Sequence, residues 1–289
     1  MFARPLAYIG KISDTPTIAF TRMNGLGNDF IVIDARETPL ALTPAQVRAL
    51  AARDHAKTQG CDQLLVIHPP RATGDAFMQI FNADGSEVEA CGNGARAVAA
   101  FLAQHGMAQA TLETLGGALN CRARVNGDKA DVSIDMPLPL FEPAMSLHKD
   151  LPEAQCVNMG NPHGVIFVTT GTAGLAAQYG FQLEHHKAFP HGANINFASL
   201  QGDNIIRLDT WERGVGLTQA CGTGACATAA AAIAQGLCAP GAVTIRPPFN
   251  KDDNAHDVIV IDYIPEDHLT MSGPVAFEFD GQIGIETAS

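Results

Sequence analysis

The chain has 289 residues, of which 46% are hydrophobic and 6% aromatic, and its formal net charge is -12. This length is enough for two domains with sizeable cores. The acidic balance argues against nucleic acid or an anionic membrane surface as a partner, and no apolar run reaches the roughly 20 residues that span a bilayer.

The cysteine content favours a reduced, metal-free protein. Seven cysteines form an odd set with wide spacings in a chain that is not small, so a disulfide framework is not expected. No Cys-x-x-Cys or His-x-x-x-His pattern occurs, so the usual structural zinc motifs are absent from the sequence. Residues 1–17 contain no continuous apolar segment, and we expect an N-terminal extension rather than a signal peptide. Together these features predict a cytoplasmic protein.

The first half of the chain alternates strand and helix signals. Thr43 and Pro44 favour the start of a helix over 45–53, as its N-cap and its first helical residue. A Gly/Asn-rich turn is expected over 23–29, and a second helix over 92–105. The strands of this half are expected at 17–20, 30–34, 64–68, 77–82, 110–113, 118–125 and 129–136.

Three closely spaced prolines, Pro137, Pro139 and Pro143, indicate a linker, because proline continues neither a helix nor a central strand. After this linker the order of signals begins again, with helices expected over 173–179 and 222–235. The strands of the second half are expected at 155–159, 165–169, 193–200, 205–212, 243–246, 257–263, 268–272 and 276–279.

One motif occurs in both halves. Residues 90–101 and 220–231 each begin Ala-Cys-Gly-x-Gly-Ala and continue as an Ala-rich run that favours helix. The motif places Cys91 and Cys221, which lie 130 positions apart, at helix N-termini. Free N–H groups and the positive end of the helix dipole stabilise a thiolate at such a position. Two activated thiols on two copies of one unit suggest that both face one ligand.

Polar residues upstream of the two cysteines repeat as well. Gln63 is matched by Asn194, 131 positions later, and Asn28 is matched by Asn161 at nearly the same offset. An architectural repeat explains matched Gly and Ala, but it explains matched Cys, Asn and Gln/Asn side chains less well. The repeat therefore predicts two domains of one fold, related by an approximate twofold axis, with a site between them.

A cysteine at a helix N-terminus can act as a nucleophile, a redox thiol, a metal ligand or an acid/base. A symmetric pair suits the removal of a proton from one face of a carbon and the delivery of a proton to the other. Two helix N-termini would meet the charge of a substrate carboxylate, while Asn82 and Glu212 are polar enough for its ammonium group. From the residues alone, a two-base isomerase and a structural role for either buried thiol both stay open.

Seven motifs lie at 23–30, 62–65, 81–87, 91–96, 160–163, 211–214 and 220–225. Taken together and in this order, they resemble the diaminopimelate epimerase family. The resemblance extends from about Ile18 to the end of the chain and implies an α/β (α+β) fold of two similar domains. Each domain would be a mostly antiparallel sheet wrapped around a central helix, and a pseudo-twofold axis would relate them. The implied domains are 18–137, to which the last strand at about 275–289 returns, and 138–274.

The resemblance implies an isomerase of lysine biosynthesis that interconverts LL- and meso-diaminopimelate without a cofactor or a metal, with Cys91 and Cys221 as the acid/base pair. Asn82, Glu212 and the region of Arg213 would hold the reacting amino-acid end of this small-molecule substrate. The sequence leaves a homodimer open. The other implied contacts are the backbone N–H groups of Gly92, Asn93, Gly222 and Thr223 for the α-carboxylate, the side chains of Asn28, Gln63, Asn161 and Asn194 for the substrate's distal end, and His163 and Glu212 as partners of the thiols.

Three places depart from the family's usual residues. Asn24 stands where His is common, His191 and Gly192 stand where Glu-Arg is usual, and Leu217 replaces a polar residue that is frequent before the second cysteine. Two other functions stay open beside the epimerase. One is a related cofactor-independent amino-acid racemase of the proline racemase type, and the other is a thiol redox protein.

Overall fold

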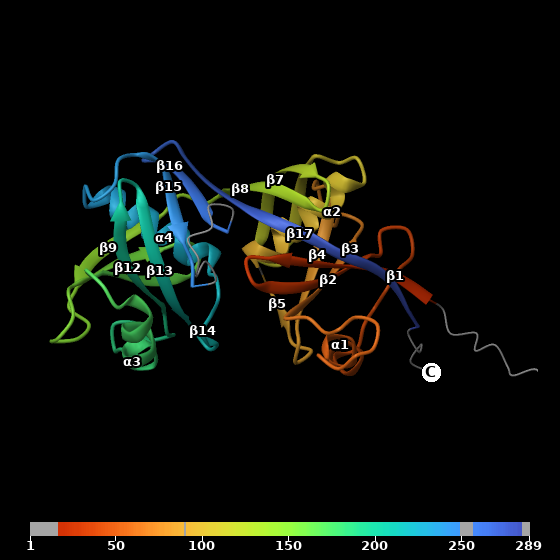
Figure 1. Cartoon of the computed structure of the whole chain (residues 1–289), viewed down its shortest axis with the longest axis horizontal. Coiled ribbons are helices and arrows are strands. Elements are labelled where there is room, and N and C mark those ends of the chain that lie inside the picture. The colour runs from red at the N-terminus through yellow and green to blue at the C-terminus, as the bar shows by residue number, and fades with distance from the viewer. Residues whose placement is uncertain (1–16, 90, 249–256, 285–289) are drawn as a thin grey trace, which may run out of the picture.

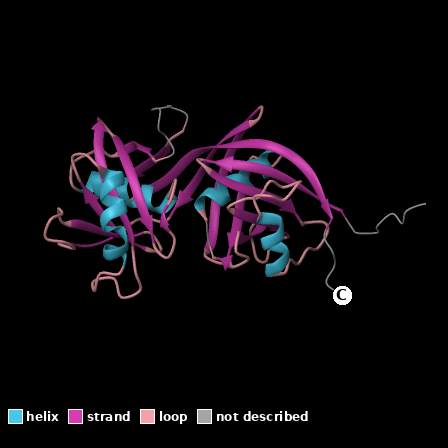
Figure 2. Ribbon diagram, turned by 60° about the horizontal axis from the view of Figure 1, so that its bottom comes forward, coloured by secondary structure: helices cyan, strands magenta, loops and turns pink. Residues whose placement is uncertain are grey.

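In the computed structural model, which describes residues 17–89, 91–248 and 257–284, the chain forms two lobes of similar construction. In each lobe the strands surround a central helix (Figures 1 and 2). This arrangement confirms the expected fold class. The helices of the described residues are α1 (Pro44–Ala51), α2 (Gly92–Gln104), α3 (Thr172–Glu184) and α4 (Gly222–Ala234).

The strands of the described residues join into one 17-stranded network. Those of the first half are β1 (Thr17–Gly25), β2 (Asn28–Asp34), β3 (Gln63–His68), β4 (Ala76–Asn82), β5 (Glu87–Val88), β6 (Gln109–Thr114), β7 (Gly117–Asn126) and β8 (Lys129–Met136). Those of the second half are β9 (Leu140–Met145), β10 (Ala154–Asn158), β11 (Pro162–Phe167), β12 (Asn194–Gly202), β13 (Ile205–Glu212), β14 (Gly216–Leu217), β15 (Gly241–Arg246), β16 (Ile259–Ile264) and β17 (His268–Gly284).

The two halves have the same strand topology. In the first half, β2 and β3 are parallel and flank α1, while β4 and β6 are parallel and flank α2. In the second half, β11 and β12 flank α3, and β13 and β15 flank α4, again as parallel pairs. Antiparallel pairing joins β3 to β4 and β12 to β13 in the same way. The repeat seen in the sequence is thus a repeat of structure.

Strand β17 connects the lobes. It pairs in turn with β16, with β8 and with β1, and crosses between the lobes in Figure 1. The sequence predicts two strands here, with a break over 273–275. That prediction is wrong, because Gly273 and Pro274 stay in register with β8, opposite Val132 and Asp131. At the junction of the two lobes, β8 of the first half serves as the partner strand of β17 and keeps it extended through Pro274.

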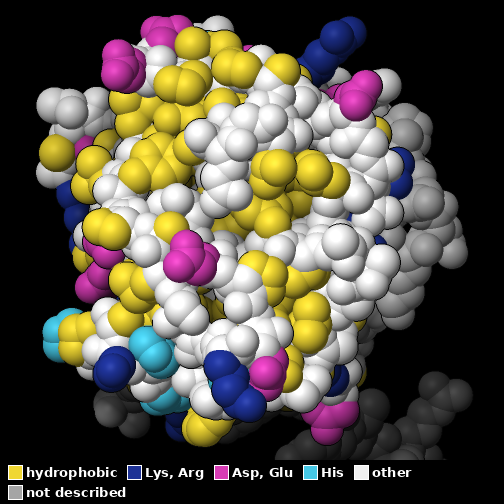
Figure 3. Space-filling model, turned by 90° about the vertical axis from the view of Figure 1, so that its left-hand side faces the viewer, with side chains coloured by type: hydrophobic (Ala, Val, Ile, Leu, Met, Phe, Trp, Pro, Cys, Tyr) yellow, Lys and Arg dark blue, Asp and Glu magenta, His cyan; other side chains and the backbone are white. Residues whose placement is uncertain are grey.

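The expected linker around Pro137 to Pro143 contains a strand that sequence patterns missed. Strand β9 pairs with β10, and an irregularity in that register lies between Ala154 and Cys156, opposite Pro143. Most of β9 is exposed, so a missing N–H is tolerated there. Figure 3 views the end of the molecule where β9 lies, and shows several apolar patches separated by polar atoms. The predicted domain boundary falls between β8 and β9, and the division there stays a prediction.

Local sequence explains where the helices begin. Thr43 and Gln46 form a capping box at α1, with Pro44 in its first turn. Cys91 and Cys221 are the N-caps of α2 and α4. Helix α4 is buried along almost its whole length because its side chains are small, as Ala227 and the run 229–232 illustrate. No helix of the described ranges is both long and apolar enough to cross a membrane.

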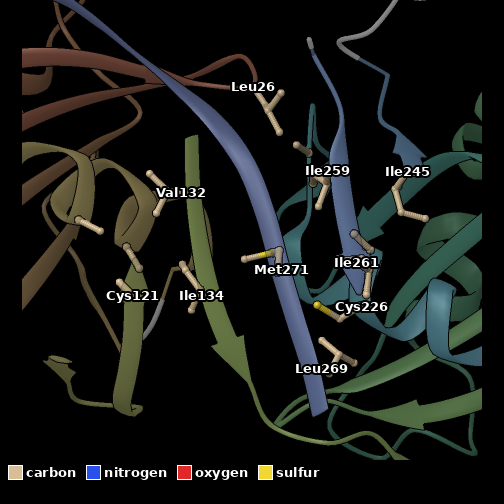
Figure 4. Close-up of a cluster of buried hydrophobic side chains, with 14 of the residues drawn as sticks. Leu26, Cys121, Val132, Ile134, Cys226, Ile245, Ile259, Ile261, Leu269 and Met271 are labelled. Atoms are coloured by element: carbon tan, nitrogen blue, oxygen red, sulfur yellow. The ribbon is translucent and has the colours of Figure 1, made fainter. Parts of the chain in front are cut away.

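One hydrophobic core passes through both lobes. It includes Ile134 of β8, Met271 of β17 and Cys226 of α4, all buried. Figure 4 shows Met271 between the side chains of the first lobe and those of the second. Because apolar packing continues across the junction, the ends of α2 and α4 that meet there are held in a shared core.

Candidate active site

The two repeated cysteines cap two helices in the same way. Cys91 has an extended backbone, and its Sγ accepts a hydrogen bond from the Gly94 amide at 3.3 Å. Cys221 repeats this arrangement, with the Gly224 amide 3.4 Å from its Sγ. Such a cap aims helix N–H groups at the sulfur and thereby favours its negative form. Both sulfurs are therefore placed where sequence reasoning expected them.

The first turns of the two helices meet. Asn93 of α2 donates from Nδ2 to the carbonyl of Ala220 at 3.3 Å. Met271 lies against both turns, since a Cβ built on Gly92 would be 3.1 Å from its Cε and one on Gly222 would be 3.0 Å from its Sδ. Any larger residue at Gly92 or Gly222 would displace Met271. The Gly-x-Gly motif thus allows the two helix ends to approach one another.

The polar residues of the first half lie at one end of their sheet. Asn28 begins β2, Gln63 begins β3, and Asn82 ends β4. Gln63 donates from Nε2 to Asn82 Oδ1 at 3.1 Å. Asn28 Oδ1 accepts from Asn93 Nδ2 at 2.6 Å, which joins this end of the sheet to the start of α2. Parallel pairing of β2 with β3 and antiparallel pairing of β3 with β4 explain why these three ends coincide.

The second half repeats this geometry. Asn161, just before β11, donates from Nδ2 to Thr223 Oγ1 of α4 at 3.4 Å. This pair stands where Asn28 and Asn93 stand in the first half. Asn194, at the start of β12, accepts from the Arg213 backbone amide at 2.9 Å. Both halves therefore direct an amide side chain from a strand end to the first turn of the cysteine-capped helix.

Glu212 breaks the symmetry near the thiols. Its carboxylate accepts a hydrogen bond from Thr218 Oγ1 at 2.6 Å. Burial raises the pKa of Glu212, while hydrogen bonds from Thr218 and Cys221 oppose that rise. Burial raises the pKa of the Cys221 thiol well above its usual range, and the negative charge of Glu212 adds to this. Burial also raises the pKa of Cys91, against the Gly94 amide, which lowers it. Burial therefore opposes ionisation of both sulfurs, and the helix N–H groups favour it.

His163 is almost completely buried and lies in a hydrogen-bond chain. Its Nε2 lies 2.9 Å from Asn161 Oδ1, and its Nδ1 lies 3.1 Å from Asn196 Nδ2. The amide of Asn196 is oriented by Thr210, which donates to its Oδ1 at 2.9 Å. Because Asn196 donates and Asn161 accepts, the neutral ring carries its proton on Nε2. Burial, and then the charge of Arg213, lowers the pKa of His163 to about 3.

His163 was expected to be a partner of one thiol. In this structure its two ring nitrogens bind Asn161 and Asn196 instead. Two residues, Asn161 and Thr223, therefore lie between the ring and the Cys221 thiol, and the ring orients Asn161.

The positions that depart from the family's usual residues have local roles. Asn24 donates from Nδ2 to Asp29 Oδ1 at 3.0 Å and stabilises the turn after β1. Arg213 donates from Nη1 to the His191 carbonyl at 3.3 Å, and its chain packs over Gly192. Leu217 is exposed on β14. These contacts direct the guanidinium of Arg213 toward the segment that precedes β12.

Sequence reasoning missed several residues of the site, among them Asn196, Thr210, Thr218 and Met271. Asn196 could have been found, because it lies two positions after Asn194 and alternate residues of a strand share a face. Met271 carries no such signal, since only strand pairing brings it to the helix ends. Among the described residues, no group of three or more His, Cys, Asp or Glu side chains is arranged to hold a metal ion.

Comparison with known sequences points to one family. A family model described as "Diaminopimelate epimerase" matches residues 20–139 and 155–248. The diaminopimelate epimerase of Sphingopyxis alaskensis is 44% identical over 276 residues, which cover 91% of this chain and 96% of that protein. The diaminopimelate epimerase of Rhodospirillum centenum is 42% identical over 279 residues, which cover 91% of each chain.

Solved structures share the fold at low sequence identity. A predicted epimerase from Pseudomonas aeruginosa has a TM-score of 0.69 and 15% identity, and the match covers 93% of this chain and 100% of that one. A hydroxyproline epimerase from Agrobacterium vitis has a TM-score of 0.63 and 16% identity, covering 94% of this chain and 93% of that one. At such identities the likeness concerns the fold alone.

Proposed function

Because the chain belongs to the diaminopimelate epimerase family, and so to the isomerases, we propose that Cys91 and Cys221 are the two bases of its reaction. One observation supports this assignment above all others. Both cysteines cap helices whose first turns meet, joined by the hydrogen bond from Asn93 to Ala220 and by Met271. A carbon held between such caps has a sulfur on each side.

The charges of diaminopimelate fit the polar groups around the thiols. Its reacting end carries a carboxylate, which the N–H groups of two helix N-termini would bind, and an ammonium, which Glu212 and Asn82 would accept. Its second amino-acid end requires further amide partners, and four lie at the strand ends of the two halves. The proposed contacts are Gly92, Asn93, Gly222 and Thr223 for the α-carboxylate, Asn82, Glu212 and Arg213 for the reacting end, and Asn28, Gln63, Asn161 and Asn194 for the distal end.

The proposed reaction inverts Cα by two proton transfers. One cysteine, as thiolate, removes the Cα proton and becomes a thiol, while the other thiol delivers its proton to the opposite face and becomes a thiolate. The carbanion between these transfers places its charge on the α-carboxylate, which the helix N-termini stabilise. The pair exchanges protonation states in each turnover, so LL- and meso-diaminopimelate interconvert through one arrangement.

Glu212 is proposed to set the protonation state of Cys221. The negative charge of this carboxylate raises the pKa of the Cys221 thiol, and burial raises the pKa of Glu212 itself, which makes it a better proton acceptor. Transfer of the S–H proton to Glu212 yields the thiolate that the reaction requires. A bound substrate ammonium would offset the negative charge that now raises the pKa of both thiols. His163 would act indirectly, by orienting the side chain of Asn161.

Two further features of the proposal concern where and how the enzyme works. The seven cysteines are free, which supports a reducing compartment such as the cytoplasm. The described residues contain no helix that could span a membrane. A homodimer stays a prediction.

Proton exchange at Cα tests the proposed roles. In deuterated water the reduced enzyme should convert LL- to meso-diaminopimelate and introduce deuterium at Cα. Cys91→Ser and Cys221→Ser should each lose epimerisation by roughly three orders of magnitude, because each removes one of two groups that act as a unit. Measurement by mass spectrometry and chiral chromatography reports exchange and inversion separately.

Cys226→Ser is the matched control, since Cys226 lies on α4 but is packed in the core. It should retain activity within about threefold. Full activity in either cysteine variant at the caps would contradict two-base catalysis. Activity on proline, with none on diaminopimelate, would favour the racemase alternative, and catalysed disulfide exchange would favour the redox alternative.

A further inference from the structure

Arg96 carries a buried positive charge that the proposed mechanism does not use. It lies in α2, five positions after Cys91, and its side chain is completely buried. Its Nε and Nη2 have no hydrogen-bond partner in the structure. Its Nη1 lies 3.9 Å from Met271 Sδ, a weak acceptor. Burying an ion without a counter-charge is costly, so a guanidinium in this state needs a functional explanation.

The fold keeps space for this guanidinium. A Cβ built on Gly273 of β17 would lie 3.2 Å from Arg96 Nε, and one on Gly25 of β1 would lie 4.0 Å from Nη2. Glycine at position 273 lets β17 pass close to the charged group, while β1 at Gly25 lies at ordinary van der Waals distance from it. No ion pair to a carboxylate is present at Arg96 among the described residues. The positive charge of Arg96 therefore has no carboxylate partner in the described structure, and a bound anion or an ionised thiol could compensate it.

The side chain of Met271 lies between Arg96 and the N-terminal turns of α2 and α4. The same side chain that contacts Nη1 lies against the first turns at Gly92 and Gly222. Figure 4 shows Met271 at the junction of the lobes, with Cys226 on the opposite side from Ile134. Charges interact strongly over such short paths when little water intervenes. Arg96 thus lies behind the place where negative charge develops.

The repeat makes this charge asymmetric. Cys226 follows Cys221 by five positions, as Arg96 follows Cys91, so the second half carries a neutral thiol in the equivalent place. Burial raises the pKa of Cys226 to about 12, and the thiol does not neutralise the guanidinium. The charge of Arg96 also lowers the pKa of Cys91, against the effect of burial. Of the two cysteine-capped helices, only α2 has a positive charge in its second turn.

We propose that Arg96 is a positioning residue that acts through the electrostatic field, as a fixed positive charge behind both helix N-termini. It favours the thiolate of Cys91 and holds the substrate α-carboxylate over the joined helix ends. This role deepens the proposed function and rests on it. It also assigns the two thiols unequal resting states, with Cys91 the easier to deprotonate.

Alkylation of Cys91 at different pH values tests this role. Arg96→Met keeps the length of the side chain and removes its charge, so the midpoint of Cys91 alkylation by iodoacetamide should move up by about one pH unit. Alkylation near neutral pH should then slow by about tenfold, as should kcat/KM on its rising limb. Arg96→Lys keeps the charge and should leave the midpoint within about 0.3 unit. Peptide mapping identifies the alkylated cysteine, and circular dichroism confirms folding.

Cys226→Ala is the matched control at the equivalent position of α4, and it should leave the Cys91 midpoint unchanged. A folded Arg96→Met variant with the wild-type midpoint would show that Arg96 is structural only. If Arg96→Met does not fold, Arg96→Lys provides the test. This variant keeps the charge, so a Cys91 alkylation midpoint that moves up by a full pH unit would overturn the proposal. Alkylation requires no substrate, so failure of the epimerase assignment would be seen separately, in the deuterium experiment.

Discussion

At the scale of single residues, burial controls the charge of the groups around the thiols. His163, Glu212 and Cys221 are all withdrawn from water, and each pKa moves in the direction of the neutral form. Their hydrogen bonds then determine which atom carries the proton. Asn196 and Asn161 hold His163 as the neutral ring with its proton on Nε2. Burial thus favours the neutral forms of His163, Glu212 and Cys221.

The depressed pKa of His163 predicts a pH dependence of stability. The folded-state pKa of about 3 lies below the ordinary value of 6.5 in the unfolded chain. Between these values the unfolded state binds more protons, so this group's contribution is complete above about pH 6.5 and is lost as the pH falls. We expect a slope of up to about 1.4 kcal/mol per pH unit in the free energy of unfolding, measured by urea denaturation, and a reduced slope in His163→Gln.

Thr210→Val provides the control for this slope. It removes the hydroxyl that orients Asn196 but no titrating group, so it should lower the free energy of unfolding equally at all pH values. An unchanged slope in His163→Gln would mean that another group causes the acid sensitivity.

At the scale of an element, the first turn of α4 depends on Gly224, because any larger residue there would collide with its neighbours. A Cβ built on Gly224 would lie 2.6 Å from Asn196 Oδ1, and 3.2 Å from both Cys221 Sγ and Thr210 Oγ1. The motif residue therefore serves the strand network as well as the cap. The equivalent Gly94 is less crowded, with Leu65 as its nearest neighbour at 3.2 Å.

Gly224→Ala should reduce both stability and activity. The methyl group would displace Asn196, which is a hydrogen-bond partner of His163. Such overpacking should lower the free energy of unfolding by roughly 1–3 kcal/mol. Epimerase activity should fall at least tenfold, since the Cys221 cap shifts as well. Denaturation midpoints and initial rates, measured on the same preparations, check both parts.

Gly174→Ala in α3 is the matched control for this change. Nothing lies within 4 Å of a Cβ at Gly174, so alanine there should stabilise the helix by roughly 0.4–1 kcal/mol and leave activity unaltered. Equal effects of the two substitutions would refute the steric argument.

At the scale of the whole molecule, β17 pairs with strands of both lobes. Its first part lies beside β16, and its last part closes the first lobe beside β1, where Ile283 is buried. The hydrophobic core also continues through Met271 at the junction. Loosening one lobe should therefore weaken the other, and the site between the helix ends depends on both.

Ile283→Ala tests this coupling. Removing the buried side chain should cost roughly 2–5 kcal/mol, and the loss should appear in the second lobe, which contains the single tryptophan, Trp211. The midpoint of urea unfolding followed by Trp211 fluorescence should move with that followed by circular dichroism. Gln282→Ala, exposed on the same strand, should move neither. A Trp211 midpoint that stays in place would show that the lobes unfold independently.

The sequence by itself determined what is local. Helix caps at Thr43, Cys91 and Cys221 follow from residues within a few positions of each other, and the repeat of 130 positions predicted two similar lobes. The family motifs predicted the epimerase, and the comparisons confirm it.

Tertiary structure decided what depends on pairing across the chain. The bond from Asn93 to Ala220 joins residues 127 positions apart, and the contact from Arg96 to Met271 spans 175. No local pattern reports such contacts, because strand register and the burial of a charge depend on which segments meet. The partners of His163, Asn161 and Asn196, come from neighbouring segments of the second half, which strand pairing brings together. The unbroken course of β17 depends on both lobes, because its successive parts pair with β16, β8 and β1.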